Sequence, residues 1–190
     1  MFEWLNKAEM GILDGIQDVF GCGFMDALVP ALTFFGNAGW MWIAMGLIFL
    51  FFRKYRRTGI TLLVGLVAHL LTCNILLKNL IARDRPCWLN DSVDLLIANP
   101  TDYSFPSGHT MVSFVAATVL TVLHPKWGYW AFPIAALMGF TRLYLYVHFP
   151  TDVLAGAILG VIVGILVTVG MKKLFEYLEK KLQNRIGFEA

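Results

Sequence analysis

The chain has 190 residues, of which 58% are hydrophobic and 15% are charged, and its mean hydropathy is +0.67. Soluble domains carry about 25% charged residues, so this composition indicates an integral membrane protein. The formal net charge of +2 is small, and the basic residues do not alternate with aromatic residues along one stripe, so no nucleic-acid partner is expected.

We expect one membrane domain over residues 1–190, because no linker, acidic tail or internal repeat divides the chain. The N-terminus carries early glutamates and lacks a basic start followed by an apolar core, so no cleavable signal is predicted. Cys22, Cys73 and Cys87 do not have the spacing of metal ligands and are interpreted as packing residues.

Apolar residues recur at helical spacing over residues 1–20, while most of the charged residues fall on other positions. This pattern predicts an amphipathic helix that lies at the membrane interface. Packing of the same helix against the bundle is the alternative. The apolar positions are Phe2, Leu5, Ile12, Ile16 and Val19.

A weak span follows over residues 20–36. Pro30 is expected to interrupt it, Gly36 and Asn37 to end it, and its single charge is Asp26, so a full membrane crossing is left open. Five stronger apolar segments come next, each able to form all or most of a transmembrane helix. They cover residues 38–52, 58–77, 107–123, 128–146 and 151–171. We therefore predict an all-α integral membrane protein with a bundle of six transmembrane helices.

Basic segments predict the orientation of this bundle. Residues 53–57, RKYRR, join the second and third spans, and a group of lysines follows the last span. Because positive residues favour the cytoplasmic face, both termini are expected in the cytoplasm. The loops at 78–106 and 147–150 then lie outside the cell. The lysines are Lys172, Lys173, Lys180 and Lys181.

Polar residues gather at the outer ends of the last four predicted spans. Cations placed together repel one another unless an anion lies among them, and arginine suits phosphate because its planar fork donates two hydrogen bonds. Arg142 lies in an apolar stretch, where a charge needs a partner or a function; snorkelling to the interface is the alternative. The cluster predicts a phosphate-like ligand. Its members are Lys78, Arg83, Arg85, Ser107, His109, Arg142, His148 and Asp152.

The segment PSGHT at residues 106–110 predicts the start of a helix at this phosphate site. Pro106 is compatible with the first turn, Ser107 offers a hydroxyl, and the unpaired amides that follow favour an anion. An ordinary N-cap is the alternative, and it explains Ser107 without explaining His109.

His148 and Asp152 stand four residues apart across Pro150, which favours a new helix start. A carboxylate near one imidazole nitrogen leaves the other nitrogen free to attack phosphorus. A hydrogen bond at the interface is the alternative for this pair, but His109 supplies the acid that phosphoryl transfer also needs. His69 lies in the middle of a span and His124 on the opposite face, so both are expected to be structural or incidental.

Three segments together resemble the signature motifs of a known family: KNLIARDRP at residues 78–86, PSGH at 106–109 and TRLYLYVHFPTD at 141–152. In order and spacing they resemble the motifs of the type 2 phosphatidic acid phosphatase superfamily, PAP2, which also includes vanadium-dependent haloperoxidases and glucose-6-phosphatase. The catalytic motifs span residues 78–152. The layout of six spans is similar to that of the small bacterial membrane members, so the resemblance extends over most of the chain.

The resemblance implies a role for each matching residue. His148 is the implied nucleophile, Asp152 its orienting partner and His109 the general acid. Fixed cations neutralise the transferred phosphate, so no metal or other cofactor is implied. Thr141 stands where the third motif commonly has serine, and Arg83 and Asp84 occupy variable positions of the first motif and are left outside the core site. The implied phosphate-binding residues are Lys78, Arg85, Ser107, Gly108 and Arg142.

The expected function is that of a membrane lipid phosphatase that removes a terminal phosphate at the outer leaflet through a phosphohistidine. Small bacterial relatives act on undecaprenyl diphosphate, phosphatidylglycerophosphate, phosphatidic acid or lipid A. The outer loop at 87–105 is short, and an uncovered site suits a diphosphate, so undecaprenyl diphosphate is the favoured substrate. Phosphatidylglycerophosphate or phosphatidic acid is the alternative. The loop residues Asp91, Asp94 and Asp102 are interpreted as rim charges that keep it solvated.

An anion or lipid-phosphate transporter is the alternative of another class, with the cations used only for binding. Such a protein is expected to have helix breaks near the middle of the membrane, whereas the polar residues here lie at the ends of spans. The expected partners are the lipid substrate and membrane lipids, and no obligate protein partner is evident.

Overall fold

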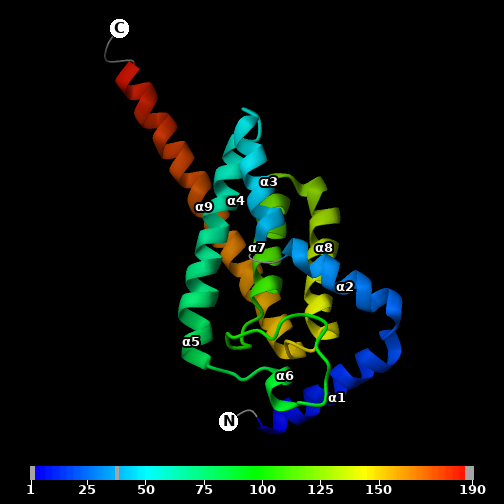
Figure 1. Ribbon diagram of the computed structural model, residues 1–190. Helices are drawn as coiled ribbons and strands as arrows, with labels where there is room; N and C mark the ends of the chain where they lie inside the picture. The colour runs from blue at the N-terminus through cyan, green and yellow to red at the C-terminus, as the bar shows by residue number, and fades with distance from the viewer. Residues whose placement is uncertain (1–2, 37–38, 187–190) are drawn as a thin grey trace.

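The computed structural model describes residues 3–36 and 39–186, and within these ranges the chain is helical and contains no strand (Figure 1). Phe2 of the predicted amphipathic pattern and Asn37 of the predicted helix end lie outside the described residues. The first helices are α1 (Glu3–Phe20), α2 (Gly23–Gly36), α3 (Trp40–Phe51), α4 (Arg56–His69), the π-helix η2 (Leu70–Leu77) and α5 (Lys78–Ile81). They are followed by α6 (Pro86–Leu89), α7 (Gly108–Leu123), α8 (Pro125–Tyr144) and α9 (Pro150–Ile186).

The predicted apolar segments all form helices, but several boundaries differ from the predictions. Pro30 lies inside α2 and does not interrupt it. The segment predicted at 58–77 continues as helix to Ile81, because η2 and α5 follow α4 without a break. The last helix runs to Ile186, whereas its apolar part ends near residue 171.

Length and hydropathy identify two candidate membrane spans among the described residues, within Arg56–Leu89 and Pro150–Asn184. Three further helices are apolar but shorter, and they cover Gly23–Phe34, Trp40–Phe51 and Gly108–Leu123. The all-helical architecture of the described residues is therefore confirmed, and two helices are long and apolar enough to cross a membrane, while the number of six spans stays a prediction.

The predicted N-terminal helix is present as α1, and it packs against the bundle. It buries Glu9 and Leu13, and Leu13 contacts the cluster that contains Tyr146 and Phe149. Ile12 and Val19, assigned to the same apolar face, remain 53% and 74% exposed. The face that α1 buries is therefore partly polar.

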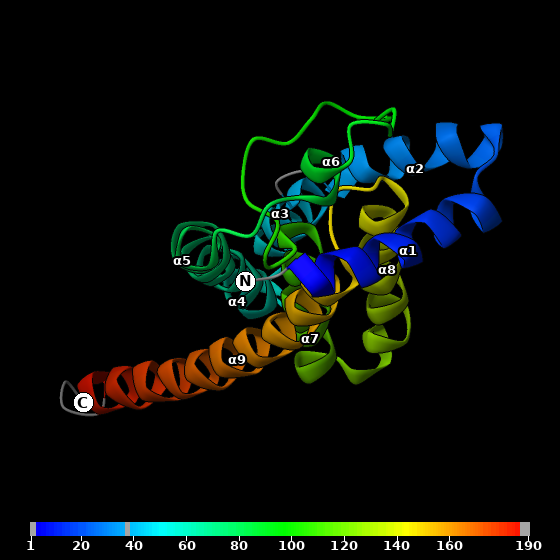
Figure 2. The ribbon, with the colours of Figure 1, turned by 90° about the horizontal axis from the view of Figure 1, so that it is seen from below.

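The helix α1 and the C-terminal half of α9 lie at opposite ends of the bundle (Figure 1). Figure 2 views the molecule from the end that carries α1 and α6, and α9 extends away from this end. The helix α2 is only 14 residues long and does not return the chain across the bundle. The cytoplasmic location expected for both termini stays a prediction.

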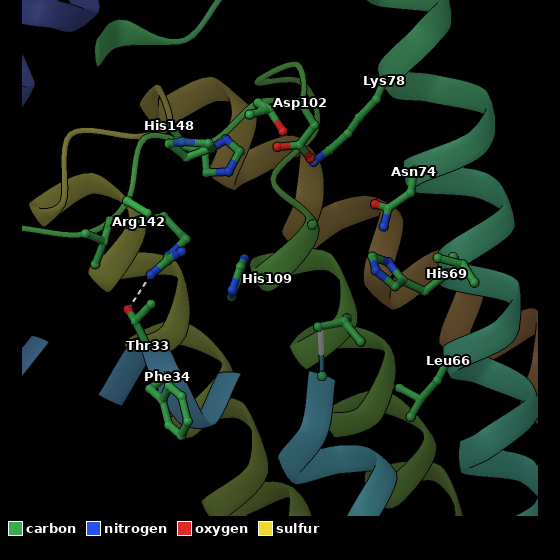
Figure 3. Close-up of a pocket in the computed structure, with 18 of the residues that line it drawn as sticks. Thr33, Phe34, Leu66, His69, Asn74, Lys78, Asp102, His109, Arg142 and His148 are labelled. Atoms are coloured by element: carbon green, nitrogen blue, oxygen red, sulfur yellow. Dashed lines mark hydrogen bonds and ion pairs between the residues drawn. The ribbon is translucent and has the colours of Figure 1, made fainter. Parts of the chain in front are cut away.

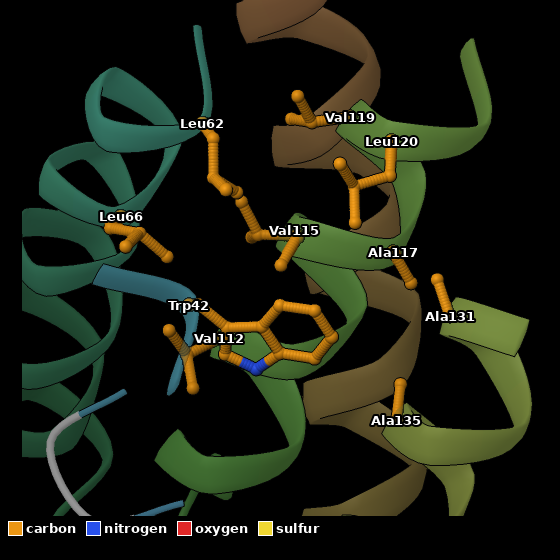
Figure 4. Packing of buried hydrophobic residues seen from close by; sticks show 11 residues of the cluster. Trp42, Leu62, Leu66, Val112, Val115, Ala117, Val119, Leu120, Ala131 and Ala135 are labelled. Carbon is orange, nitrogen blue, oxygen red and sulfur yellow. The ribbon is translucent and has the colours of Figure 1, made fainter. Parts of the chain in front are cut away.

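The core of the bundle surrounds α7, which contacts α9, α8 and α4. Its small and β-branched residues let these helices approach from several sides. Trp42 from α3 lies against this core with 1% of its surface exposed, and its indole nitrogen donates a 3.2 Å hydrogen bond to Ser113. Figure 4 shows this packing, with Val112, Val115, Ala117, Val119 and Leu120 contributed by α7.

Glycines on α9 allow a close approach to α7. Gly156, Gly160 and Gly164 recur every four residues and therefore share one face of the helix. A Cβ atom at Gly156 would lie 2.7 Å from the carbonyl oxygen of Ser107, and one at Gly160 would lie 2.6 Å from that of Met111. This face therefore holds the start of α9 against the start of α7.

We expect Gly160→Ala to destabilise the protein, because its methyl group would collide with a backbone oxygen 2.6 Å away. Overpacking of this kind costs about 1–3 kcal/mol, which appears as a lower Tm in detergent. Gly170→Ala is the matched control on the same helix, because its Cβ would meet no atom within 4 Å. Equal Tm values for the two variants would contradict the close packing of α7 and α9.

Candidate active site

A cavity of about 910 Å³ opens between α2, η2, α7, α8 and the loop that precedes α7 (Figure 3). Most of the predicted site residues line it, although they come from distant parts of the sequence. Ser107 and Asp152 are completely buried directly behind this lining. The residues that line the cavity as predicted are Lys78, Arg85, Gly108, His109, Arg142 and His148.

The cavity is polar at one end and apolar at the other. Its polar end contains the cations and imidazoles of the predicted site. Its remaining wall is mostly hydrocarbon, which suits the tail of an amphipathic ligand. This apolar wall includes Pro30, Phe34, Ile43, Leu63, Leu66, Val67 and Leu70.

Arg85 is held rigidly beside His148. Its guanidinium donates to the carbonyl oxygens of Val147 at 2.7 Å and Asp102 at 2.6 Å. The Nη1 atom also lies 3.2 Å from Nε2 of His148. Because Arg85 is only 3% exposed and has these fixed partners, it presents a preorganised positive charge at Nε2 of His148.

Lys78 and Arg85 share a carboxylate partner, Asp102. Lys78 forms an ion pair with Oδ2 of Asp102, and Arg85 donates to Oδ1 at 2.7 Å. Burial alone would raise the pKa of Asp102, but the hydrogen bonds and charges of these two cations lower it to about 2. Asp102 is exposed like Asp91 and Asp94, as expected for a rim charge, but it also pairs with two cations of the cavity, which the sequence did not indicate.

Arg142 reaches the cavity from the end of α8 and is 3% exposed. It donates to the hydroxyl of Thr33 on α2, and its Nε lies 3.3 Å from the hydroxyl of Thr141. The threonine at the position where serine is common therefore still supplies a hydroxyl to the arginine. Neither partner neutralises its charge, so Arg142 is a strong site for an anion.

His148 and Asp152 are adjacent, but a direct hydrogen bond between them is absent. Nδ1 of His148 lies 3.7 Å from Oδ2 of Asp152, and the hydroxyl of Ser104 donates to the same carboxylate oxygen and lies 3.4 Å from Nδ1. The predicted pairing is thus mediated in part by Ser104. This serine was missed because its loop contains no recognisable spacing.

The environment of His148 favours a neutral imidazole with the lone pair of Nε2 directed toward Arg85. Burial, followed by the positive charge of Arg85, holds the pKa of His148 well below its ordinary value. Because Asp152 and Ser104 face Nδ1 and the donor Arg85 faces Nε2, the proton belongs on Nδ1. Nε2 then carries the lone pair of the imidazole.

The backbone at the start of α7 and the first turn of α9 are joined next to this pair. The amide of Ser107 donates to the carbonyl of Asp152 at 3.0 Å, and the Ser107 hydroxyl lies 2.9 Å from that of Thr110. Ser107 occupies the N-cap position of α7, but its side chain makes no capping hydrogen bond. The ordinary N-cap interpretation therefore does not account for it.

Arg83 supports the site, although the sequence placed it outside the core. It is 2% exposed, donates to Asp152 at 2.6 Å and to Glu9 at 2.6 Å, and lies over the ring of Phe149. Glu9 also accepts a 2.7 Å hydrogen bond from the amide of Thr151. No spacing could connect Glu9 with Arg83, because the contact joins positions 74 residues apart.

His69 and His124, which were both expected to be structural or incidental, lie in different surroundings. His124 lies at the far end of the bundle, where Nε2 is 2.8 Å from the hydroxyl of Thr58, as expected for a structural residue. His69 lines the same cavity as Lys78 and His109, so the expectation that it stays outside the cluster is wrong. Asn74, which the sequence analysis did not single out, also lines this cavity.

The comparison with protein families identifies the chain. A model described as the PAP2 superfamily matches residues 58–176, which is more than half of the sequence. The chain belongs to the PAP2 superfamily. Together with its phosphatase relatives, this match shows that the chain is a hydrolase of the phosphatase class.

Related PAP2 proteins support the same assignment. An undecaprenyl-diphosphatase of Sulfolobus acidocaldarius is 34% identical over 162 residues, which cover 84% of this chain and 71% of that protein. The crystal structure of a transmembrane PAP2 phosphatidylglycerolphosphate phosphatase from Bacillus subtilis has a TM-score of 0.73 and 27% identity, covering 90% of this chain and 88% of that one. The crystal structure of Aquifex aeolicus LpxE has a TM-score of 0.68 and 29% identity, covering 84% and 94%.

We expect Asp102→Asn to strengthen inhibition of this PAP2 phosphatase by vanadate, because it frees Lys78 and Arg85 from a competing anion. Ion pairs to a half-exposed carboxylate are worth about 0.2–1 kcal/mol each, so losing both should lower Ki about two- to thirtyfold. Since the pKa of Asp102 is about 2, the wild type keeps this negative charge and the difference should persist from about pH 5 to 8.

Asp91→Asn is the control, because this exposed carboxylate lies on the same loop. It should leave Ki unchanged. Weaker inhibition of the Asp102→Asn variant would show instead that the carboxylate is needed to orient the two cations.

Proposed function

We propose that this PAP2 phosphatase removes the terminal phosphate of a lipid phosphate or diphosphate, with undecaprenyl diphosphate as the favoured substrate, and that it does so through a phosphohistidine. One observation carries the proposal. The nucleophilic Nε2 of His148 lies 3.2 Å from Arg85 in a cavity that combines a cationic end with an apolar wall. Such a cavity accepts a phosphate headgroup and the start of a hydrocarbon tail together.

In the first step, Nε2 of His148 attacks the terminal phosphorus. A P–N bond forms while the bond between phosphorus and the lipid oxygen breaks, and the electron pair of that bond stays on the oxygen. His109, in the first turn of α7, donates a proton to this oxygen as it leaves. The lipid alcohol or lipid monophosphate is then released.

In the second step, water attacks the phosphohistidine. His109, now neutral, accepts a proton from the water, and the P–N bond breaks with its electron pair returning to His148. Inorganic phosphate leaves and both histidines regain their initial states. One water molecule is consumed in the complete reaction.

The charge that develops on the transferred phosphoryl group is stabilised by Lys78, Arg85 and Arg142. These cations are 6%, 3% and 3% exposed, so they act where water screens charge poorly. The amides at the start of α7, beginning with Gly108, add donors on another side. We therefore propose that the reaction needs no metal ion.

The favoured substrate rests on the relatives and on the open cavity. The relative from Sulfolobus acidocaldarius is an undecaprenyl-diphosphatase. Phosphatidylglycerophosphate is the alternative, supported by the structural likeness to the Bacillus subtilis enzyme; phosphatidic acid belongs to the same alternative. An anion or lipid-phosphate transporter would use the same cations, but it gives the paired histidines no role.

Phosphate release from a panel of these lipids in detergent, with chelator present, tests the proposed chemistry. We expect His148→Ala to lose activity completely and His109→Ala to lose about 10²- to 10⁴-fold, the usual contribution of a general acid. With radiolabelled substrate, His109→Ala should retain label on the protein and His148→Ala should not. His124→Ala is the matched control, since this residue lies at the far end of the bundle.

Each contrary result would contradict a different part of the proposed function. Activity abolished by the chelator would contradict the metal-free reaction. Full activity of His148→Ala would remove the nucleophile, and binding of lipid phosphate without any phosphate release would favour the transporter.

We further propose that the bundle crosses the membrane five times, through α3, the continuous helix α4–η2–α5, α7, α8 and α9, with the basic segment 53–57 and the lysines of α9 in the cytoplasm and the cavity on the outer side. This number replaces the expected six, because α2 does not return the chain across the bundle. The helix α1 then lies on the outer side with the cavity, because Glu9 contacts Arg83 and Thr151 there. This placement revises the expected cytoplasmic location of the N-terminal segment. It keeps the lysines on the side that positive residues favour.

Single cysteines in a Cys22→Ser background test this arrangement. Cys87 is 7% exposed and burial raises its pKa, so it is a poor target for a thiol reagent. We expect an impermeant reagent to label Lys7→Cys and Ser92→Cys in intact cells, and Lys180→Cys only after permeabilisation. All three positions are exposed. Labelling of Lys7→Cys only after permeabilisation would restore the cytoplasmic N-terminal segment.

A further inference from the structure

His69 is a buried polar residue that the proposed reaction does not use. Its side chain lines the cavity and is 7% exposed, and its Nδ1 has no hydrogen-bond partner among the described residues. Buried polar atoms in native proteins nearly always have a partner. A nitrogen of this kind on a cavity wall therefore indicates a polar group of the ligand.

The π-helix η2 explains why His69 faces the same cavity as Lys78. In an α-helix of 3.6 residues per turn, positions nine apart lie about 180° apart, on opposite faces. The i→i+5 bonding of a π-helix gives about 4.4 residues per turn, and positions nine apart then differ by only about 20°. Since η2 covers Leu70–Leu77 between them, His69 and Lys78 lie on one face. π-Helical segments often occur at functional sites.

Asn74 lies between these two residues on the same wall. A Cβ atom at Gly108 would be 3.5 Å from Oδ1 of Asn74 and 3.9 Å from Nζ of Lys78, so the carboxamide stands beside the start of α7. Figure 3 shows Lys78, Asn74, His69 and Leu66 in succession along this wall, with His109 between His69 and Arg142. The wall thus changes in steps from charged, through neutral polar, to apolar.

A substrate placed for the proposed reaction passes along this wall. Its terminal phosphorus faces His148 and its leaving oxygen faces His109, so the part retained on the lipid extends past His69 toward Leu66. A hydrocarbon tail that began at the leaving oxygen would place apolar atoms against Asn74 and the unpaired nitrogen of His69, which is unfavourable. A second phosphate at this level would accept hydrogen bonds from both.

We propose that His69 and Asn74 form a second subsite, which binds the phosphate group that the lipid retains after hydrolysis. This inference rests on the proposed function and narrows its substrate class to lipids with a second phosphate. The retained phosphate is joined directly to the transferred phosphate in a prenyl diphosphate, and through glycerol in phosphatidylglycerophosphate. Lipids with a single phosphate lack the group and leave the subsite unused.

The test compares substrates that differ only in the second phosphate. The pairs are farnesyl diphosphate with farnesyl monophosphate, and phosphatidylglycerophosphate with phosphatidic acid. In His69→Leu and Asn74→Leu we expect kcat/KM to fall about 10- to 100-fold for the substrates with two phosphates, the usual effect of losing a hydrogen bond to a charged group. For the single-phosphate substrates it should change less than about threefold.

Two further variants separate recognition from structure. His69→Gln keeps a polar donor and should recover much of the lost activity. Asn79→Leu is the control for Asn74→Leu, because Asn79 bonds to the carbonyl of Ile75 and does not line the cavity. If kcat/KM falls only for farnesyl diphosphate, or only for phosphatidylglycerophosphate, the result identifies which linkage between the two phosphates the subsite accepts. An equal loss on both members of each pair, or no loss, overturns the proposal.

A binding measurement keeps this test independent of the proposed function. Calorimetry compares methylenediphosphonate with orthophosphate on wild type and His69→Leu. We expect the wild type to bind the diphosphonate more tightly, and this preference to be lost in the variant, whether or not any of the four lipids is hydrolysed. The proposal fails if the preference is absent or unchanged. Phosphate release from none of the lipids would instead contradict the proposed function.

Discussion

The arrangement of the active site depends on one buried guanidinium, that of Arg83. It joins α1, through Glu9, to the first turn of α9, through Asp152, with both contacts at 2.6 Å. An ion pair that is 2% exposed on one side and 0–5% on the other stabilises only while all of its partners are present. The carboxylate that supports His148 is therefore held by the N-terminal helix as much as by its own helix.

Much of the site could be predicted because its chemistry is costly in a membrane. Arg142 in an apolar segment and His148 before Pro150 stand out against their neighbours, and charged residues in such surroundings must be paired or functional. The order of helices could be predicted for the same reason, since each apolar run has to bury its backbone hydrogen bonds within itself. Residue type and spacing were sufficient for these features.

The features that were missed depend on contacts between distant segments or on local helix geometry. Ser104 and Asp102 lie in a loop, where no periodicity indicates which side chains turn inward. His69 was misplaced because a sequence is read with the period of an α-helix, while η2 adds the rotation of a wider helix. The position of α1 depends on Glu9, whose partner lies 74 residues away.

The length of α9 has a consequence for how deep the reaction takes place in the lipid. Pro150 begins this helix beside His148, and Lys172 is the first charged residue after its apolar part. The 22 residues between them (172 − 150) span about 33 Å at 1.5 Å per residue, close to the hydrocarbon thickness of about 30 Å. In the proposed arrangement the lysine lies among the headgroups of one leaflet, and α9 is then a rigid spacer that places the imidazole of His148 at the headgroups of the other. This arrangement would make the reaction depend on bilayer thickness, because a thicker membrane would hold the same imidazole below the plane in which the phosphate groups lie.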